Sequence, residues 1–88
     1  MVEIGLMATE LSRAGKSASP SDITAIAHAV REARRREGMT QTELAGLSGT
    51  GLRFVSELER GKPNVALNKV VAVLSALGLR LDVRGDPS

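Results

Sequence analysis

The sequence contains no cysteine and only one aromatic residue, Phe54, among its 88 residues. Without cysteine the chain can hold neither a disulfide framework nor a thiolate metal site. Because tryptophan and tyrosine are also missing, the core has to be built from aliphatic side chains. Apolar residues make up 42% of the chain, which is enough for one small core. A chain of this length buries about 60–65% of its unfolded surface, so we expect one domain that is marginally stable as a monomer.

Long hydrophobic segments are also missing. No apolar run approaches the roughly 20 residues that a membrane span needs. The first residues carry Glu3 where a secretory signal would carry basic residues, so we expect a cytoplasmic protein. The net charge is only +2, although the pI of about 9.7 is basic, and the placement of the charges therefore matters more than their sum.

The residues that catalysis requires are scarce. His28 is the single histidine, and no other ligand type lies near it in the sequence to complete a metal site. The chain also has no evident nucleophile–base pair and no carboxylate pair in a plausible pocket. We therefore expect a binding protein without enzymatic activity, metal or cofactor.

Regular periodicity begins only after the first 19 residues. Residues 1–19 have a loose apolar pattern without a helix cap, which predicts an N-terminal extension that is flexible or forms a short helix. Ser21 is then predicted to cap a helix, with Asp22 in its first turn and Gly38 as its stop. The apolar residues of this helix recur at helical spacing, at Ile23, Ile26, Ala27, Val30 and Ala33.

Three shorter helices are predicted next. Thr40 and Glu43 match a capping box, which opens a helix that runs to about Leu47. A third helix is expected at about residues 52–60 and a fourth at about 66–77, ending before a glycine. Their predicted buried residues are Leu44 and Ala45, then Phe54, Val55 and Leu58, then Leu67, Val70, Val71, Leu74 and Leu77.

The segment LRLDV near the C-terminus has the alternation of a β-strand. Leu79, Leu81 and Val83 lie on one face of this predicted strand. A single edge strand on a helical domain leaves its backbone groups unpaired, so we expect it to pair with the same strand of a second protomer. The alternative is that these three side chains only cap the core.

Residues 41–58 have the spacing of a helix-turn-helix. With Gln41 as the first position, a small residue at the fifth, Ala45, lets two helices cross closely. Gly49 at the ninth position can adopt the left-handed conformation that the turn needs. Val55 and Leu58 then pin the following helix to the others. This arrangement directs the start of the third helix outward, where it fits the major groove of DNA.

The sequence MTQTELAGLSGTGLRFVSELERGKPN resembles the helix-turn-helix of phage repressor and Cro proteins, the XRE family. The C-terminal part is similar to HipB-like antitoxins, which are dimeric operator-binding partners of HipA-type kinase toxins. The resemblance covers about residues 20–84. The chain departs from the family pattern at Gly46, at Thr50 and at Gly51, where a serine or threonine cap is usual.

The resemblance implies a mainly α fold with four or five helices and a C-terminal strand that pairs across a homodimer. It divides the chain into the extension at 1–19, a DNA-binding domain at 20–78 and a dimerisation strand and tail at 79–88. It also implies an ion pair between Arg34 and Glu59.

The resemblance further implies two sets of DNA contacts. The residues expected to contact bases are Leu52, Arg53, Ser56 and Glu57. Those expected to contact phosphates are Gln41, Thr42, Gly51, Arg60 and Lys62. Among them, Arg53 suits a guanine edge, Leu52 suits a thymine methyl group, and Glu57 can accept from cytosine. The exposed arginines of REARRRE, at positions 31, 35 and 36, are either solvated or peripheral phosphate contacts.

Three functions are compatible with the sequence. The chain is expected to be an antitoxin that neutralises a HipA-like kinase toxin and represses its own operon at a palindromic operator, in association with the bacterial nucleoid. The alternatives are a free-standing repressor without a toxin and an interaction adaptor that no longer binds DNA. The sequence does not indicate the operator, the toxin or any small-molecule effector.

Overall fold

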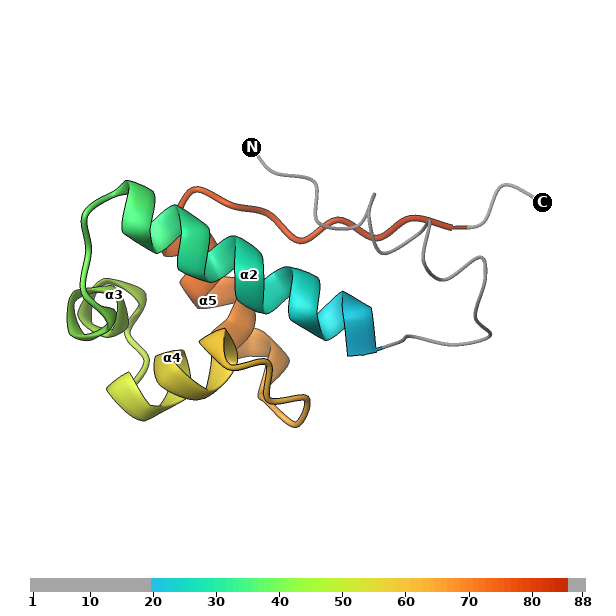
Figure 1. Ribbon diagram of the computed structural model, residues 1–88, viewed down its shortest axis with the longest axis horizontal. Helices are drawn as coiled ribbons and strands as arrows, with labels where there is room; N and C mark the ends of the chain where they lie inside the picture. The colour runs from blue at the N-terminus through green and yellow to red at the C-terminus, as the bar shows by residue number, and fades with distance from the viewer. Residues whose placement is uncertain (1–19, 86–88) are drawn as a thin grey trace.

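The computed structural model describes residues 20–85, and within that range the chain folds into four α-helices without a sheet (Figure 1). The helices are α2 (Pro20–Arg36), α3 (Gln41–Ser48), α4 (Leu52–Glu59) and α5 (Leu67–Ala76). Helix α3 packs against α4 and α5, while α4 also packs against α2. The prediction of a mainly helical domain is confirmed. The predicted extension at residues 1–19 lies outside the described residues.

Helix α2 begins at Pro20, so the prediction that Ser21 caps it was wrong. Proline is tolerated in the first turn, because the N–H that it lacks would have no partner inside the helix. Asp22 lies in that first turn, as expected, and three arginines occupy the last turn. These charges suit the partial charges at the two helix ends.

The capping box at the start of α3 is confirmed. The Thr40 hydroxyl accepts a hydrogen bond from the backbone N–H of Glu43 (3.0 Å), and the Glu43 carboxylate accepts one from the backbone N–H of Thr40 (2.8 Å). Two backbone donors that have no partner within the helix are thereby satisfied. The first turn of α3 is thus fixed by local sequence.

The turn between α3 and α4 depends on Gly49, which has a φ of 71°. The next N–H, that of Thr50, bonds to the carbonyl of Ala45 (3.1 Å). Thr50 is polar where the family usually has an apolar residue, but its hydroxyl shares a hydrogen bond of 2.8 Å with that of Ser48. The unusual residue therefore contributes a second link across the turn.

Replacing Gly49 by alanine should destabilise the protein by about 1–2 kcal/mol, because an L-residue is strained in the left-handed conformation. A Cβ at this position would meet no atom within 4 Å, so backbone strain is the only cost. Gly46→Ala is the matched control, since Gly46 lies inside α3 in equally open space. It should stabilise the protein by about 0.5–1 kcal/mol. Urea unfolding of both variants measures the two changes, and effects of the same sign would contradict the assigned turn.

The core is aliphatic and receives side chains from all four helices. Its members are Val30 and Ala33 from α2, Leu44 and Ala45 from α3, Val55 and Leu58 from α4, Val70, Val73 and Leu74 from α5, and finally Leu79. Phe54 is only partly buried against this cluster. Most of the residues predicted to be buried in α2, α3 and α4 are thus buried in, or packed against, this core.

The predicted burial of α5 was partly wrong. Leu67 and Val71 are 64% and 47% exposed, whereas Val73, which was not predicted, is completely buried. Either Val71 or Val73 can share a helix face with Val70 and Leu74, so the sequence alone does not decide which of the two is buried. Packing into the core shared by the four helices buries Val73.

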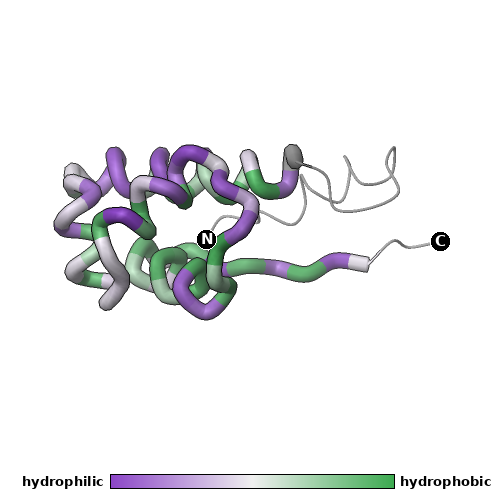
Figure 2. Tube along the Cα trace, turned by 90° about the horizontal axis from the view of Figure 1, so that it is seen from below, coloured by the Kyte–Doolittle hydropathy of each residue, from purple (hydrophilic) through white to green (hydrophobic). Residues whose placement is uncertain are grey.

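The C-terminal segment at residues 79–85 is extended. No strand is assigned among the described residues, where Arg80 has only an isolated bridge. Its apolar side chains become more exposed along the chain: Leu79 belongs to the core, Leu81 is half-buried and Val83 is 91% exposed. Figure 2 shows the segment leaving the helical body with hydrophobic and hydrophilic residues in alternation.

Candidate nucleic-acid interface

The start of α4 points away from the core, and the packing of α4 against α3 and the turn between them fix it there. Val55 and Leu58 anchor the inner face of α4 in the core, and Ala45 provides a small contact on α3. At the start of α4, Leu52 is half exposed, and on the face opposite the core the Arg53 side chain is 92% exposed. The first turn of α4 therefore presents one apolar and one cationic side chain on a rigid support.

A partly buried ion pair fixes this support to α2. Arg34 donates from Nε to Glu59 Oε2 (2.6 Å), from Nη2 to Glu59 Oε1 (3.0 Å) and from Nη1 to the Met39 carbonyl (2.7 Å). The two side chains are only 13% and 4% exposed. This is the pair that the family resemblance implied, and its two parallel hydrogen bonds set the orientation of both side chains.

The surroundings of Glu59 favour its charged form. Burial alone would raise the pKa of this carboxyl, but the hydrogen bonds from Arg34 and Gln41 and the charge of Arg34 outweigh burial and lower the pKa below its ordinary value. The carboxylate is therefore ionised at neutral pH, and it links the end of α4 to α2 and to the start of α3.

Gln41 belongs to this network. Its side-chain amide donates to Glu59 Oε1 (3.1 Å), so the side chain expected at a phosphate is turned toward the ion pair. The backbone N–H groups in the first turn of a helix have no partner within it. The groups of α3 that could bind a phosphate are therefore its N-terminal backbone N–H groups and the exposed Thr42 hydroxyl. The Gln41 amide has one further N–H, because only one hydrogen bond goes to Glu59.

The other expected contact residues form a second cluster around Glu57. Its Oε1 accepts a hydrogen bond from Lys62 Nζ (3.2 Å), and its Oε2 lies 3.5 Å from Arg53 Nε. Lys62 and Arg53 lower the pKa of the Glu57 carboxyl, with the hydrogen bond from Lys62 as the main cause. Ser56 is partly buried and Arg60 is exposed. The sequence did not predict that Glu57 joins α4 to the loop after it.

Gly51 is the N-cap of α4, and no side chain caps this helix. The exposed backbone N–H groups at this end are therefore available to an anion. On α2, the side chains of Arg31, Arg35 and Arg36 are exposed, and no ion pair among the described residues involves them. Both earlier interpretations of these arginines, as solvated groups or as peripheral phosphate contacts, remain open.

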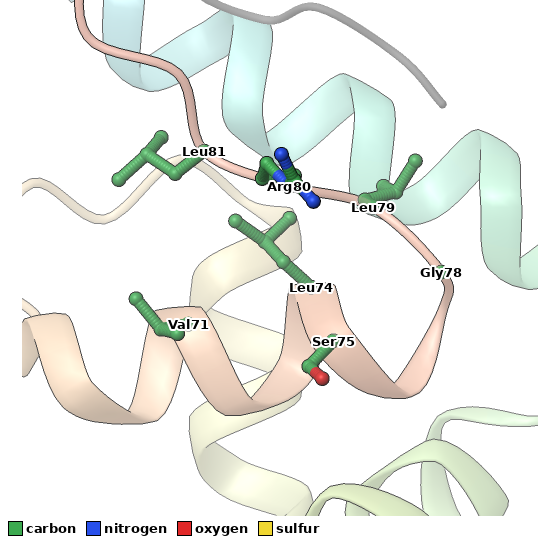
Figure 3. Close-up of a pocket in the computed structure, with 7 residues that line it drawn as sticks. All are labelled: Val71, Leu74, Ser75, Gly78, Leu79, Arg80 and Leu81. Atoms are coloured by element: carbon green, nitrogen blue, oxygen red, sulfur yellow. The ribbon is translucent and has the colours of Figure 1, made fainter.

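A groove of about 540 Å³ lies between α5 and the C-terminal segment. Figure 3 shows Val71 and Leu74 pointing from α5 toward the segment that carries Leu79 and Leu81. This wall is mainly apolar. The exposure of Val71 is thus part of a surface that continues onto the extended segment.

No group of three or more His, Cys, Asp or Glu side chains is placed to hold a metal ion between residues 20 and 85. In the same range, no helix is long and apolar enough to cross a membrane.

The fold and the outward-facing α4 define a helix-turn-helix protein. A family profile described as helix-turn-helix matches residues 30–83, and the chain belongs to this family. It is also 45% identical over 65 residues to a protein of Sinorhizobium fredii, which is named an uncharacterized HTH-type transcriptional regulator, y4mF. The match covers 74% of this chain and 82% of that relative.

Proposed function

We propose that this protein is a transcriptional regulator that binds DNA sequence-specifically as a homodimer and represses transcription from a palindromic operator. The observation that carries the proposal is the fully exposed Arg53 at the start of α4, on a helix whose opposite face is anchored in the core. Membership of the helix-turn-helix family and a relative named as a regulator support it. The proposed role requires no catalysis, metal or cofactor.

The dimer is proposed to form through the C-terminal segment. Leu81 lines the apolar groove along α5 and is only partly buried against the core, while Val83 is exposed. Pairing of residues 79–83 with the same residues of a second copy would satisfy the open backbone groups and cover the groove. It would also hold two α4 helices about 34 Å apart, or a multiple of that distance, as two half-sites on one face of DNA require.

We further propose that the regulator is an antitoxin whose partner is a HipA-like kinase toxin. The support for this finer assignment is the resemblance of its C-terminal part to HipB-like antitoxins. A kinase-like reading frame next to the gene, and co-purification of its product with this protein, would support the role. A free-standing repressor would have no such neighbour.

Arg53→Ala should weaken binding to the preferred DNA by about 1–3 kcal/mol and relax the preference at one base pair in each half-site. The reason is that a guanidinium can donate two hydrogen bonds to O6 and N7 of one guanine. The measurement is a gel-shift titration with the DNA upstream of the gene and with a duplex selected from a random-sequence pool by the wild-type protein.

Arg60→Ala is the control for a contact that carries no sequence information, since Arg60 is exposed and forms no ion pair among the described residues. It should weaken binding to all duplexes about equally and reduce the slope of log K against log salt by about 0.9. Gln41→Ala is less suitable, because it also removes a hydrogen bond from Glu59. If Arg53→Ala leaves affinity and base preference unchanged, α4 does not read bases. If the wild-type protein binds no duplex, the adaptor function takes the place of the repressor function.

A further inference from the structure

We propose that Glu57 determines DNA specificity by positioning Arg53 and restraining Lys62, and that it does not itself contact a base; this inference rests on the proposed function. Glu57 lies one helical turn after Arg53, and the two oxygens of its carboxylate face different cations. Oε2 faces Arg53 Nε (3.5 Å), and Oε1 accepts a hydrogen bond from Lys62 Nζ (3.2 Å).

The geometry disfavours Glu57 as an acceptor for cytosine. To reach a base, the carboxylate would have to leave one of its two cationic partners and approach the phosphates with its charge less compensated. The side chain is only 21% exposed, whereas that of Arg53 is 92% exposed. The group that extends furthest from α4 toward a ligand is therefore the guanidinium, and Glu57 lies behind it.

The closest approach of Glu57 is to Nε, and within residues 20–85 no hydrogen bond is formed by the two terminal nitrogens of Arg53. These are the two donors that can bind O6 and N7 of a guanine together. Arginine has a long side chain that loses much rotamer freedom when it binds. A carboxylate 3.5 Å from Nε favours the rotamers that keep the two charges close, so part of this freedom is lost before DNA arrives and the two donors meet a guanine at a smaller entropic cost.

The contact with Lys62 has the opposite effect on binding without sequence preference. Phosphates attract cations regardless of sequence, and this attraction supplies most non-specific affinity. Glu57 offsets one of the two positive charges beside it, so the cluster attracts every DNA backbone less strongly. This lowers the affinity for right and wrong sequences alike, so the preference itself has to come from Arg53, while fewer wrong sequences are occupied at a given protein concentration.

The test is Glu57→Gln, which keeps the shape of the side chain and removes its charge. Its affinity is measured on the duplex selected by the wild-type protein and on a scrambled duplex of the same composition, at about 50 to 200 mM salt. We expect tighter binding to the scrambled duplex and a ratio of selected to scrambled affinity that falls by about tenfold, within the range of one lost bidentate contact. The salt slope on the scrambled duplex should become steeper by about 0.9, because Lys62 is released to a phosphate.

Glu32→Gln is the matched control, since Glu32 is exposed on α2 and the replacement changes the net charge equally. It should alter the ratio much less than Glu57→Gln. A double-mutant cycle with Arg53→Ala tests whether Glu57 acts through Arg53. In the Arg53→Ala background, Glu57→Gln should no longer weaken binding to the selected duplex relative to Arg53→Ala alone.

Three results would overturn the inference. The first is an unchanged affinity ratio in Glu57→Gln, while the wild-type protein still prefers the selected duplex. The second is loss of preference at a cytosine alone, with the guanine preference intact, which would make Glu57 a base-reading residue. The third is a wild-type protein that binds neither duplex, which would refute the proposed function as well.

Discussion

Arg34→Met should lower the free energy of unfolding by about 3–5 kcal/mol, because it leaves the carboxylate of Glu59 buried without its cation. The Glu59 side chain is only 4% exposed, so water replaces the lost partner poorly, and the Gln41 amide supplies the one other side-chain hydrogen bond to it among the described residues. A loss of this size is a large part of the stability of a small domain. Urea unfolding at neutral pH, followed by circular dichroism, measures it.

The double variant Arg34→Met, Glu59→Met should recover part of this loss, because it removes both charges and leaves apolar side chains of similar size. Arg34→Lys is a second comparison that retains the charge but cannot form two parallel hydrogen bonds. Losses that simply add in the cycle would show that the two residues do not interact.

The same cycle has a defined pH dependence. The pKa of Glu59 is lowered in the folded protein, so the coupling is complete above the pKa of an unfolded glutamate. It should disappear as the pH falls through the lower pKa of the folded state.

Val83→Asp should convert the protein into a monomer and weaken binding to its operator about a hundredfold or more, because two linked half-sites bind far more tightly than one. Val83 is 91% exposed in the single chain, so the change adds a charge without removing a core contact. In a pairing of residues 79–83 across a two-fold axis, the new carboxylates of both chains would enter the proposed interface. Sedimentation at micromolar concentration and a gel-shift titration measure the two effects.

Two further variants define this interface. Deleting residues 79–88 should also give a monomer that binds DNA poorly, but it removes the core residue Leu79 and will reduce stability for that reason as well. Leu47→Asp is the matched control, since Leu47 is an exposed apolar residue of α3 that does not line the groove. It should remain dimeric. A Val83→Asp protein that is still dimeric and binds DNA normally would place the dimer interface elsewhere.

Local sequence determined most of the fold. The capping box at Thr40 and Glu43 and the glycine at 49 act through atoms only a few residues apart, so their geometry does not depend on the rest of the chain. Local spacing also indicated the helix-turn-helix, because Ala45, Val55 and Leu58 each meet a steric need of that motif. The pairing of Arg34 with Glu59 came from the family resemblance, since nothing local links residues 25 positions apart.

Tertiary contacts decided what the local pattern left open. Helical spacing in α5 is compatible with burial of either Val71 or Val73 beside Val70 and Leu74, and packing into the core shared by the four helices buries Val73. The end of α4 lies beside the start of α3, which turns the Gln41 amide toward Glu59. A side chain adopts the position in which it forms the better hydrogen bond or buries more apolar surface. In these cases the contacting groups belong to another helix, and the position of that helix depends on the packing of the whole domain.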